Sequence, residues 1–271
     1  MRMEPAKAAA IKKAIKANFD ASVQNYDEFE AGTGLFSFLS LELARVADVE
    51  EGARVVDVCC GTGVSTRVLL SMVGRSGHVT GIDFSPKMLE EARRRCSAFS
   101  NVDFIEGDAE KLEGLLGYRT YDAILYNACI FLLPDAGASL RGARNSVKPG
   151  GRVAMNFVEG SYIDGRELFT ELFPEWSGKA FPAPKFPSDT ATLEAVLAES
   201  VFTRVQSGTM EKLMPLDHLK RFYQVPAQSA SLYPRLGLAE RKNAVQKMFK
   251  LVEEKGVSWA SMRWKWVAAT R

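Results

Sequence analysis

Residues 54–63 of the 271-residue chain read RVVDVCCGTG, the segment that is most informative about its fold. Three valines around Asp57 predict a buried strand at 54–58, and Gly61 and Gly63 predict a turn directly after it. The segment that follows has the apolar spacing of a helix. A strand that runs through a glycine turn into a helix lets the backbone approach a ligand. By itself, the arrangement is common to many nucleotide-binding proteins.

Strand-like and helix-like segments alternate from residue 53 onward, as in a sheet with helices on both faces. Strands are expected at 54–58, 78–84, 102–106, 121–128 and 151–158, and helices at 62–73, 85–99, 108–116 and 135–147. Ser85–Pro86 and Asp135 are expected to begin two of these helices. The pattern predicts the first five strands of a doubly wound α/β fold.

The two ends of the chain add further elements. Ile11, Ile15 and Phe19 recur at the spacing of one helix face. Four prolines in residues 171–189 predict a surface excursion without regular helix or strand. After it we expect a helix from Ser188–Asp189 to Ala198, a strand at 202–213, a helical section at 216–254 and a closing strand at 258–271.

Composition excludes several classes of protein. The 46% hydrophobic content supports one core, and 35 Lys and Arg against 33 Asp and Glu leave no basic run for a nucleic-acid partner. Four irregularly spaced cysteines predict neither a disulfide framework nor a metal site. The longest apolar run, 123–134, is too short to span a membrane, and the N-terminus lacks the apolar core of a signal peptide. A cytoplasmic protein with reduced thiols is expected.

Acidic residues follow the second and third strands. Asp83 lies at the end of the second strand, in VTGIDFS, and Asp108 lies in IEGDAE at the end of the third. Ligands of open α/β sheets bind beyond the carboxyl ends of the strands, and a carboxylate accepts hydrogen bonds from both hydroxyls of a ribose. One adenosine-sized ligand would therefore contact the glycine turn and both acids. As structural alternatives, Asp83 caps a helix and Asp57 binds loop amides.

Four segments in this order resemble class I methyltransferases, which use S-adenosylmethionine: VVDVCCGTG, VTGIDFSPKMLEEA, FIEGDAEKL and YDAILYNA. FDASVQNYD, upstream, resembles the entry segment of the ubiquinone and menaquinone biosynthesis C-methyltransferases and their small-molecule relatives. The resemblance implies a Rossmann-like, seven-stranded, mostly parallel sheet with helices on both faces and an antiparallel last strand. It also implies methyl transfer to a small-molecule acceptor, with release of S-adenosylhomocysteine.

The resemblance further implies a division of the chain. Residues 1–50 would form an N-terminal helical lid, and residues 51–271 the methyltransferase domain. Insertions at about 160–188 and 214–256 would shape the acceptor site. Phe169, Phe173, Trp176, Phe181 and Phe186 would line an apolar acceptor pocket or pin the proline-rich stretch to the core.

The family roles pass to matching positions of this chain. Asp83 would bind the ribose, Phe84 and Met88 would flank adenine, and Asp108 and Ala109 would meet the adenine edge. Asn127 would face the methionine portion, and Tyr26 would close over the cofactor. Beneath the sugar and amino acid would lie Asp57, Gly61 and Gly63. Cys59 stands in the cofactor loop where the family usually has glycine. Its Cβ predicts a shifted turn or cofactor position.

The chemistry places a modest demand on the protein. A sulfonium methyl group is already activated, so alignment and exclusion of water are the main requirements. A carbon or oxygen acceptor also needs proton removal, for which His218 and Tyr223 in the late helical section are candidates, with packing as the alternative. Two other functions stay open: a nicotinamide-dependent oxidoreductase, although VST follows Gly63 without a third turn glycine, and a cofactor-binding protein without turnover. The acceptor, the methylated atom and the oligomeric state stay undetermined.

Overall fold

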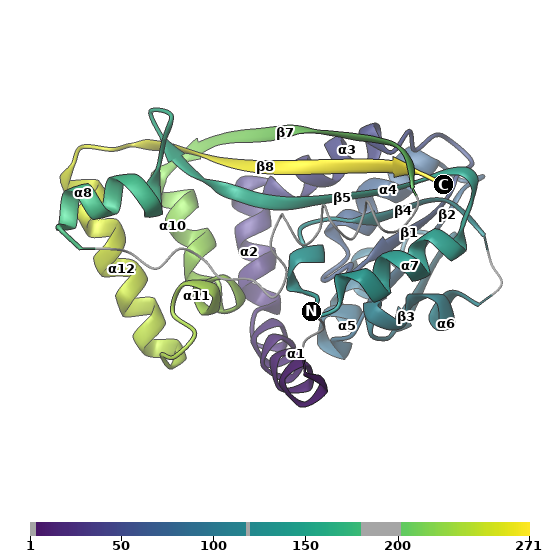
Figure 1. The fold of residues 1–271 in the computed structure, drawn as a ribbon, viewed down its shortest axis with the longest axis horizontal. Coiled ribbons are helices and arrows are strands. Elements are labelled where there is room, and N and C mark those ends of the chain that lie inside the picture. Colours follow the sequence, from purple (N-terminus) through teal and green to yellow (C-terminus); the bar gives the residue numbers. More distant parts are fainter. Residues whose placement is uncertain (1–3, 118–119, 180–201) are drawn as a thin grey trace.

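A computed structural model describes residues 4–117, 120–179 and 202–271 (Figure 1). Within these residues an eight-stranded mixed sheet has the order β3–β2–β1–β4–β5–β8–β7, and β6 pairs with β5 off this path. The strands are β1 Arg54–Val58, β2 His78–Asp83, β3 Val102–Glu106, β4 Tyr121–Tyr126, β5 Val147–Ile163, β6 Arg166–Glu167, β7 Thr203–Pro215 and β8 Trp259–Thr270. The expected Rossmann-like, mostly parallel sheet is confirmed.

Strands β1 to β5 are parallel, and β1 lies between β2 and β4. The chain order therefore reverses between β1 and β4, which is the topological switch point where ligands of such sheets bind. Val55, Val56 and Val58 are completely buried, as expected for a central strand covered on both faces. The carboxyl ends of these strands share one edge of the sheet.

The C-terminal strands extend the sheet on the other side. β8 is antiparallel to both β5 and β7, which confirms the orientation expected for the last strand. Trp264 of β8 is buried against Phe131, with ring centroids 6.4 Å apart. Figure 1 shows β5, β7 and β8 as long strands that run toward the group of α8, α10, α11 and α12 at one end of the molecule.

The helices that cover this sheet are mostly short. They are α1 Pro5–Asp20, α2 Val23–Thr33, α3 Leu35–Val46, α4 Val64–Val73, α5 Pro86–Arg95, α6 Leu112–Leu116, α7 Ala136–Ser146, α8 Phe173–Ser177, α10 Leu216–Gln224, α11 Pro226–Leu232 and α12 Leu238–Glu254. Short 3₁₀ turns occupy Ala109–Lys111 and Ile130–Leu132. Figure 1 shows α7 in front of the sheet and α3 and α4 behind it.

Both predicted helix starts are confirmed. Ser85 Oγ accepts a hydrogen bond from the Met88 N–H at 3.1 Å, and Pro86 occupies the first turn of α5. Asp135 Oδ1 accepts from the Ala138 N–H at 2.8 Å at the start of α7. Each cap satisfies a backbone donor that has no partner within its own helix.

Several expected elements differ from the structure. The expectation of no regular helix in 171–189 is wrong, because a π-helix at Leu168–Leu172 runs into α8. Pro174 is accommodated in the first turn of α8, where its missing N–H costs nothing, and Glu167 accepts from the Phe169 and Thr170 N–H groups. The expected helix at 188–198, together with Phe181 and Phe186, lies outside the described residues.

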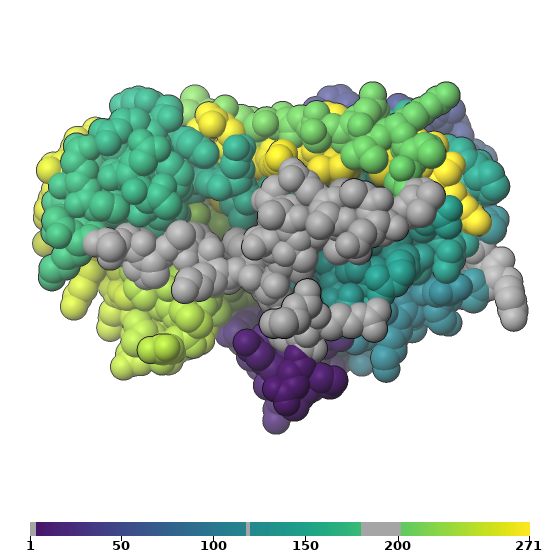
Figure 2. Space-filling model, viewed as in Figure 1, coloured from purple at the N-terminus to yellow at the C-terminus, as the bar shows by residue number. Residues whose placement is uncertain are grey.

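The N-terminal segment forms three helices. α1 and α2 lie between the strands β1–β4 and the helices α10–α12, and α1 contacts both α5 and α11 (Figure 1). α3 packs on α4 and β5, and its Leu35, Leu39 and Leu43 are completely buried. Each such leucine contributes about 1.5–3 kcal/mol by leaving water. Figure 2 shows the purple atoms of α1 projecting from the lower edge of the molecule.

Whether a helix could span a membrane can be judged for the described residues. Within the described parts of the chain, every helix is too short or too polar to cross a bilayer. The expected cytoplasmic location and the expected lack of a nucleic-acid partner stay predictions.

Candidate active site

A cavity opens at the carboxyl ends of β1 to β4, at the switch point of the sheet. The sequence-predicted cofactor residues that line it are Tyr26, Cys59, Gly61, Asp83, Phe84, Met88, Asp108, Ala109 and Asn127. They lie at or just after the ends of the four strands, on α2 and, for Met88, on α5. Asp57 and Gly63 do not line it. The cavity thus brings together residues that are about a hundred positions apart in the sequence.

Asp83 joins the ends of β1 and β2. Its Oδ2 accepts a hydrogen bond from the Gly61 N–H and its Oδ1 one from the Ser85 N–H, both at 2.9 Å. Burial raises the pKa of this carboxyl to about 6, although the backbone donors favour the charged form. Each carboxylate oxygen has two lone pairs, so Asp83 can hold the glycine loop and still accept from a ligand.

The two turn glycines have different neighbours. Gly61 has φ +54°, and a Cβ built there meets no described atom within 4 Å, so it would project into the cavity. Gly63 has φ +80°, and a Cβ there would lie 2.9 Å from Ala92 Cα of α5. Gly61 therefore keeps space for a ligand, whereas Gly63 lets α4 approach α5.

Asp57 lies beneath this loop and is 1% exposed. Its Oδ2 accepts a hydrogen bond from Thr66 Oγ1 at 2.6 Å. Burial raises its pKa to about 7, against the hydrogen bonds from Thr66 and Ser65. Asp57 fastens the start of α4 to the end of β1.

Three thiols border the cavity: Cys59, Cys60 and Cys129. Cys59 has φ +58°, the left-handed conformation that favours glycine, and the expected shift of the turn or cofactor stays a prediction. Burial raises the pKa of Cys60 and of Cys129 well above the ordinary thiol value. Both thiols therefore stay protonated and packed. No group of three or more metal-ligating side chains is found in the described residues.

Asp108 begins the turn after β3. Its Oδ1 accepts from the Glu110 N–H at 3.0 Å, and its Oδ2 accepts from Lys12 Nζ of α1 at 2.7 Å. Ala109 follows it and is 5% exposed. This end of the cavity is therefore bordered by a charged contact between α1 and the turn after β3.

Asn127 is held from two sides at the opposite end. Its Oδ1 accepts from Asn156 Nδ2 at 2.8 Å, and its own Nδ2 donates to the Phe36 carbonyl at 3.3 Å. Asn156 is completely buried in β5 and also accepts from the Ala128 N–H at 2.6 Å. Asn156 thereby fixes the loop that presents Asn127 to the cavity.

Tyr26 lines the cavity from α2. Its ring stacks on Phe19 at 5.8 Å between centroids, and its hydroxyl accepts from Gln228 Nε2 at 2.8 Å. Burial raises the pKa of this phenol far above its usual value, so the hydroxyl stays neutral. Phe19 and Ile15 of α1 continue the apolar wall.

The two predicted catalytic residues lie outside this cavity. His218 is half-buried on α10. Tyr223, also on α10, is 3% exposed, and its hydroxyl is 2.9 Å from Ser161 Oγ. Its ring packs against Phe169, Phe222 and Phe249. Phe169 and Phe173 are buried in the same aromatic cluster, and Trp176 is packed against Phe173.

Sequence reasoning missed a second group of lining residues: Lys12, Ile15, Phe19, Phe36, Leu132, Leu133 and Pro134. The spacing of Ile15 and Phe19 predicted that they share one helix face but carried no information about what that face covers. For Lys12, one lysine among several in a basic helix, the sequence offered no distinguishing feature.

Comparisons with known proteins agree with this geometry. The sequence profile of the methyltransferase domain family matches residues 49–197. The chain is 30% identical over 172 residues to the aklanonic acid methyltransferase of Streptomyces sp. (strain C5), covering 62% of this chain and 76% of the relative. It is 28% identical over 209 residues to the demethylmenaquinone methyltransferase of Bacillus licheniformis, covering 69% and 88%.

Solved structures share the fold. The phosphoethanolamine N-methyltransferase 2 of Haemonchus contortus, in complex with phosphomonomethylethanolamine and S-adenosylhomocysteine, has a TM-score of 0.58 and 16% identity over 93% of this chain. The chain spans 58% of the length of that protein. The YcgJ protein of Bacillus subtilis has a TM-score of 0.58 and 15% identity, covering 86% of this chain and 97% of that one. The chain therefore belongs to the methyltransferase domain family and is a class I S-adenosylmethionine-dependent methyltransferase.

Proposed function

We propose that the cavity at the switch point holds S-adenosylmethionine and that the chain transfers its methyl group to a small-molecule acceptor. The observation that carries this proposal is the convergence of Asp83, Asp108, Gly61 and Asn127 on one cavity from four separate strand ends. The two relatives compared above are named for small organic acceptors, aklanonic acid and demethylmenaquinone.

The residues present fit the cofactor. The open space at Gly61 is where a Cβ would obstruct the ligand, and Asp83 is a buried carboxylate that borders the same space. We assign Asp83 to the ribose hydroxyls, Phe84 and Met88 to the faces of adenine, and Asp108 with Ala109 to its edge. Gly61, Cys59 and Asn127 then lie along the methionine portion, with Asp57 and Gly63 supporting the loop from below.

The contribution of the chain to the reaction is mainly alignment. When bound, the cofactor supplies a methyl group on a positively charged sulfur. Ile15, Phe19 and Tyr26 cover the cavity and keep water from it. No histidine is among the described residues that line the cavity, and the buried Tyr26 phenol stays neutral. His218 and Tyr223 therefore take no part in this proposal.

Replacement of Asp83 tests the cofactor assignment. We expect Asp83→Ala to weaken the binding of S-adenosylhomocysteine at least about tenfold, because a carboxylate that accepts two hydrogen bonds contributes roughly 1.5–3 kcal/mol. Isothermal titration calorimetry measures this affinity without turnover. Asp83→Asn keeps one acceptor oxygen and is expected to lose less.

Thermal unfolding of each variant shows whether the loop has survived, since Asp83 also binds the Gly61 N–H. Unchanged affinity in a folded Asp83→Ala protein contradicts the assignment. So does wild-type protein that binds nicotinamide dinucleotides but not S-adenosylhomocysteine. Formation of S-adenosylhomocysteine from S-adenosylmethionine, with demethylmenaquinone or aklanonic acid as first acceptors, tests turnover.

A further inference from the structure

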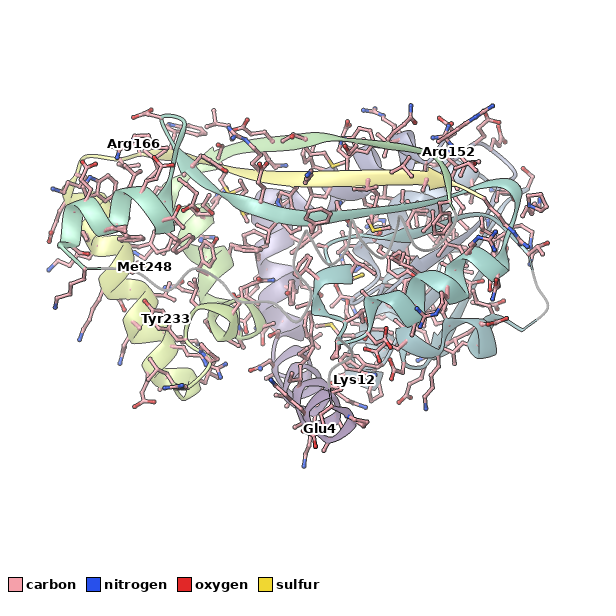
Figure 3. All side chains as sticks on the ribbon, in the orientation of Figure 1. Glu4, Lys12, Arg152, Arg166, Tyr233 and Met248 are labelled. Atoms are coloured by element: carbon pink, nitrogen blue, oxygen red, sulfur yellow. The ribbon has the colours of Figure 1, made fainter. Side chains whose placement is uncertain are left out.

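Lys12 of α1 makes a two-carboxylate contact with the turn after β3. Its Nζ lies 2.7 Å from Asp108 Oδ2 and 2.5 Å from Glu110 Oε2. The lysine side chain is 24% exposed and lines the cavity, and the Glu110 side chain is only 12% exposed. Figure 3 labels Lys12 on α1. A helix outside the sheet domain thus supplies a cation to the predicted adenine end of the site.

The two carboxylates are also held by backbone donors. Asp108 Oδ1 accepts from the Glu110 N–H at 3.0 Å, and Glu110 Oε1 accepts from the Asp135 N–H at 2.8 Å. In the described residues Lys12 is the one cation paired with either acid. Burial lowers the pKa of the Lys12 ammonium, but Asp108 and Glu110 outweigh this effect and keep that pKa above its usual value. Lys12 is therefore charged at neutral pH and offsets the repulsion between its two partners.

We propose that Lys12 is a positioning residue for recognition of the adenine amino group. Its ammonium binds the carboxylates of Asp108 and Glu110 together and so holds Asp108 in place. This inference rests on the proposed function, in which Asp108 meets the adenine edge. Without the ammonium, two neighbouring carboxylates repel each other in a half-buried setting. Asp108 then turns away from Glu110 and no longer accepts from the adenine amino group in a fixed direction.

A simpler role, docking of α1, can be separated from this one. α1 is also attached by Asp20 Oδ1, which accepts from Ser85 Oγ at 2.5 Å, and by Asn18 Oδ1, which accepts from Arg241 at 3.0 Å. Removal of the Lys12 charge therefore leaves the helix attached. A docking role affects all nucleosides equally, whereas a positioning role affects the amino group selectively.

The experiment compares two probes by calorimetry: S-adenosylhomocysteine and S-inosylhomocysteine, which has a carbonyl oxygen in place of the adenine amino group. A site that binds this amino group is expected to prefer the adenosine compound at least about tenfold. Lys12→Met is expected to weaken adenosine binding about tenfold and to reduce the preference below about threefold. Lys13→Met, at the exposed neighbouring position, is the matched control and should keep both values.

A second variant tests the repulsion directly. Lys12→Met combined with Glu110→Gln removes one of the two negative charges and keeps an acceptor for the Asp135 N–H, so the preference should recover. An equal loss for both probes in Lys12→Met, or no recovery in the double variant, overturns the positioning role. Wild-type protein that binds neither probe overturns the proposed function instead, so the two failures are distinguishable.

Discussion

Asp57 is a carboxyl that folding removes from water. It is buried at the end of β1, where burial raises its pKa to about 7. A carboxyl with a higher pKa in the folded than in the unfolded chain binds more protons when folded. Its stabilising contribution is fully present below the unfolded pKa of about 3.9. That contribution is lost as the pH rises through the folded value of about 7.

Replacement of Asp57 by asparagine should therefore flatten the pH dependence of stability. One proton changes the free energy of unfolding by at most about 1.4 kcal/mol per pH unit. In the wild-type protein without ligand, Asp57 should lower the free energy of unfolding by up to this slope between about pH 4 and pH 7. Asp57→Asn should lack this contribution, since asparagine does not titrate. Urea denaturation at a series of pH values measures it. Asp164→Asn, at an exposed position, should keep the wild-type slope, and the same slope in Asp57→Asn would refute the prediction.

At the residue scale, the sequence predicted what lies at strand ends. Asp83 ends a predicted strand, Asp108 and Asn127 come just after observed strands, and parallel strands bring their ends together. Lys12 and Phe36 could not be predicted, because their place at the cavity depends on how α1 and α3 pack in three dimensions. Asn156 was missed for a related reason: it lies within a strand and acts through Asn127.

Among the elements, the junction of β1 and α4 shows why two glycines two positions apart are not equivalent. Both have positive φ, but only Gly63 is pressed against another helix, at Ala92. Alanine at a positive φ costs about 1–2 kcal/mol. We expect Gly63→Ala to cost more than this range, because its Cβ also meets the α5 backbone and the helices must separate.

Gly61→Ala is the matched comparison for that prediction. Its free energy of unfolding should fall only by the cost of alanine at a positive φ. The variant should nevertheless bind S-adenosylhomocysteine more weakly, since its added Cβ meets open space at the cavity. Thermal unfolding and calorimetry together measure both effects. The opposite ranking, with the larger loss of stability at Gly61, would show that the roles of the two glycines are reversed.

The predicted element boundaries are correct where a cap or a glycine marks them and wrong where tertiary contacts determine them. α5 begins at Pro86, as expected, but β5 runs to Ile163 because β8 pairs with it along nearly its whole length. The stretch at 216–254 is divided into three helices, and Pro226 begins the second of them. Proline content alone did not reveal that Pro174 would occupy a first helical turn.

At the scale of the whole molecule, the cavity lies between two parts of the chain. The sheet supplies the loops after β1 to β4, while α1, α2 and α3 supply Lys12, Ile15, Phe19, Tyr26 and Phe36. α1 and α2 are in turn bound to the C-terminal helices, through Tyr26 to Gln228 and through Asn18 to Arg241. A ligand in the cavity would therefore contact sequence-distant segments at the same time, and the lid role expected for residues 1–50 stays a prediction.

This arrangement predicts where a bound ligand slows backbone motion. A ligand that binds the folded state favours closed over locally open forms of every segment it contacts. We expect saturating S-adenosylhomocysteine to slow amide hydrogen exchange in α1 and α2 as well as in the loop at 59–63, as measured by mass spectrometry of peptic peptides. α8, which contributes no lining residue, is the internal control and should change less. Protection confined to the sheet loops, with α1 and α2 unaffected at a ligand concentration that saturates the site, would mean that the N-terminal helices do not close over the cofactor.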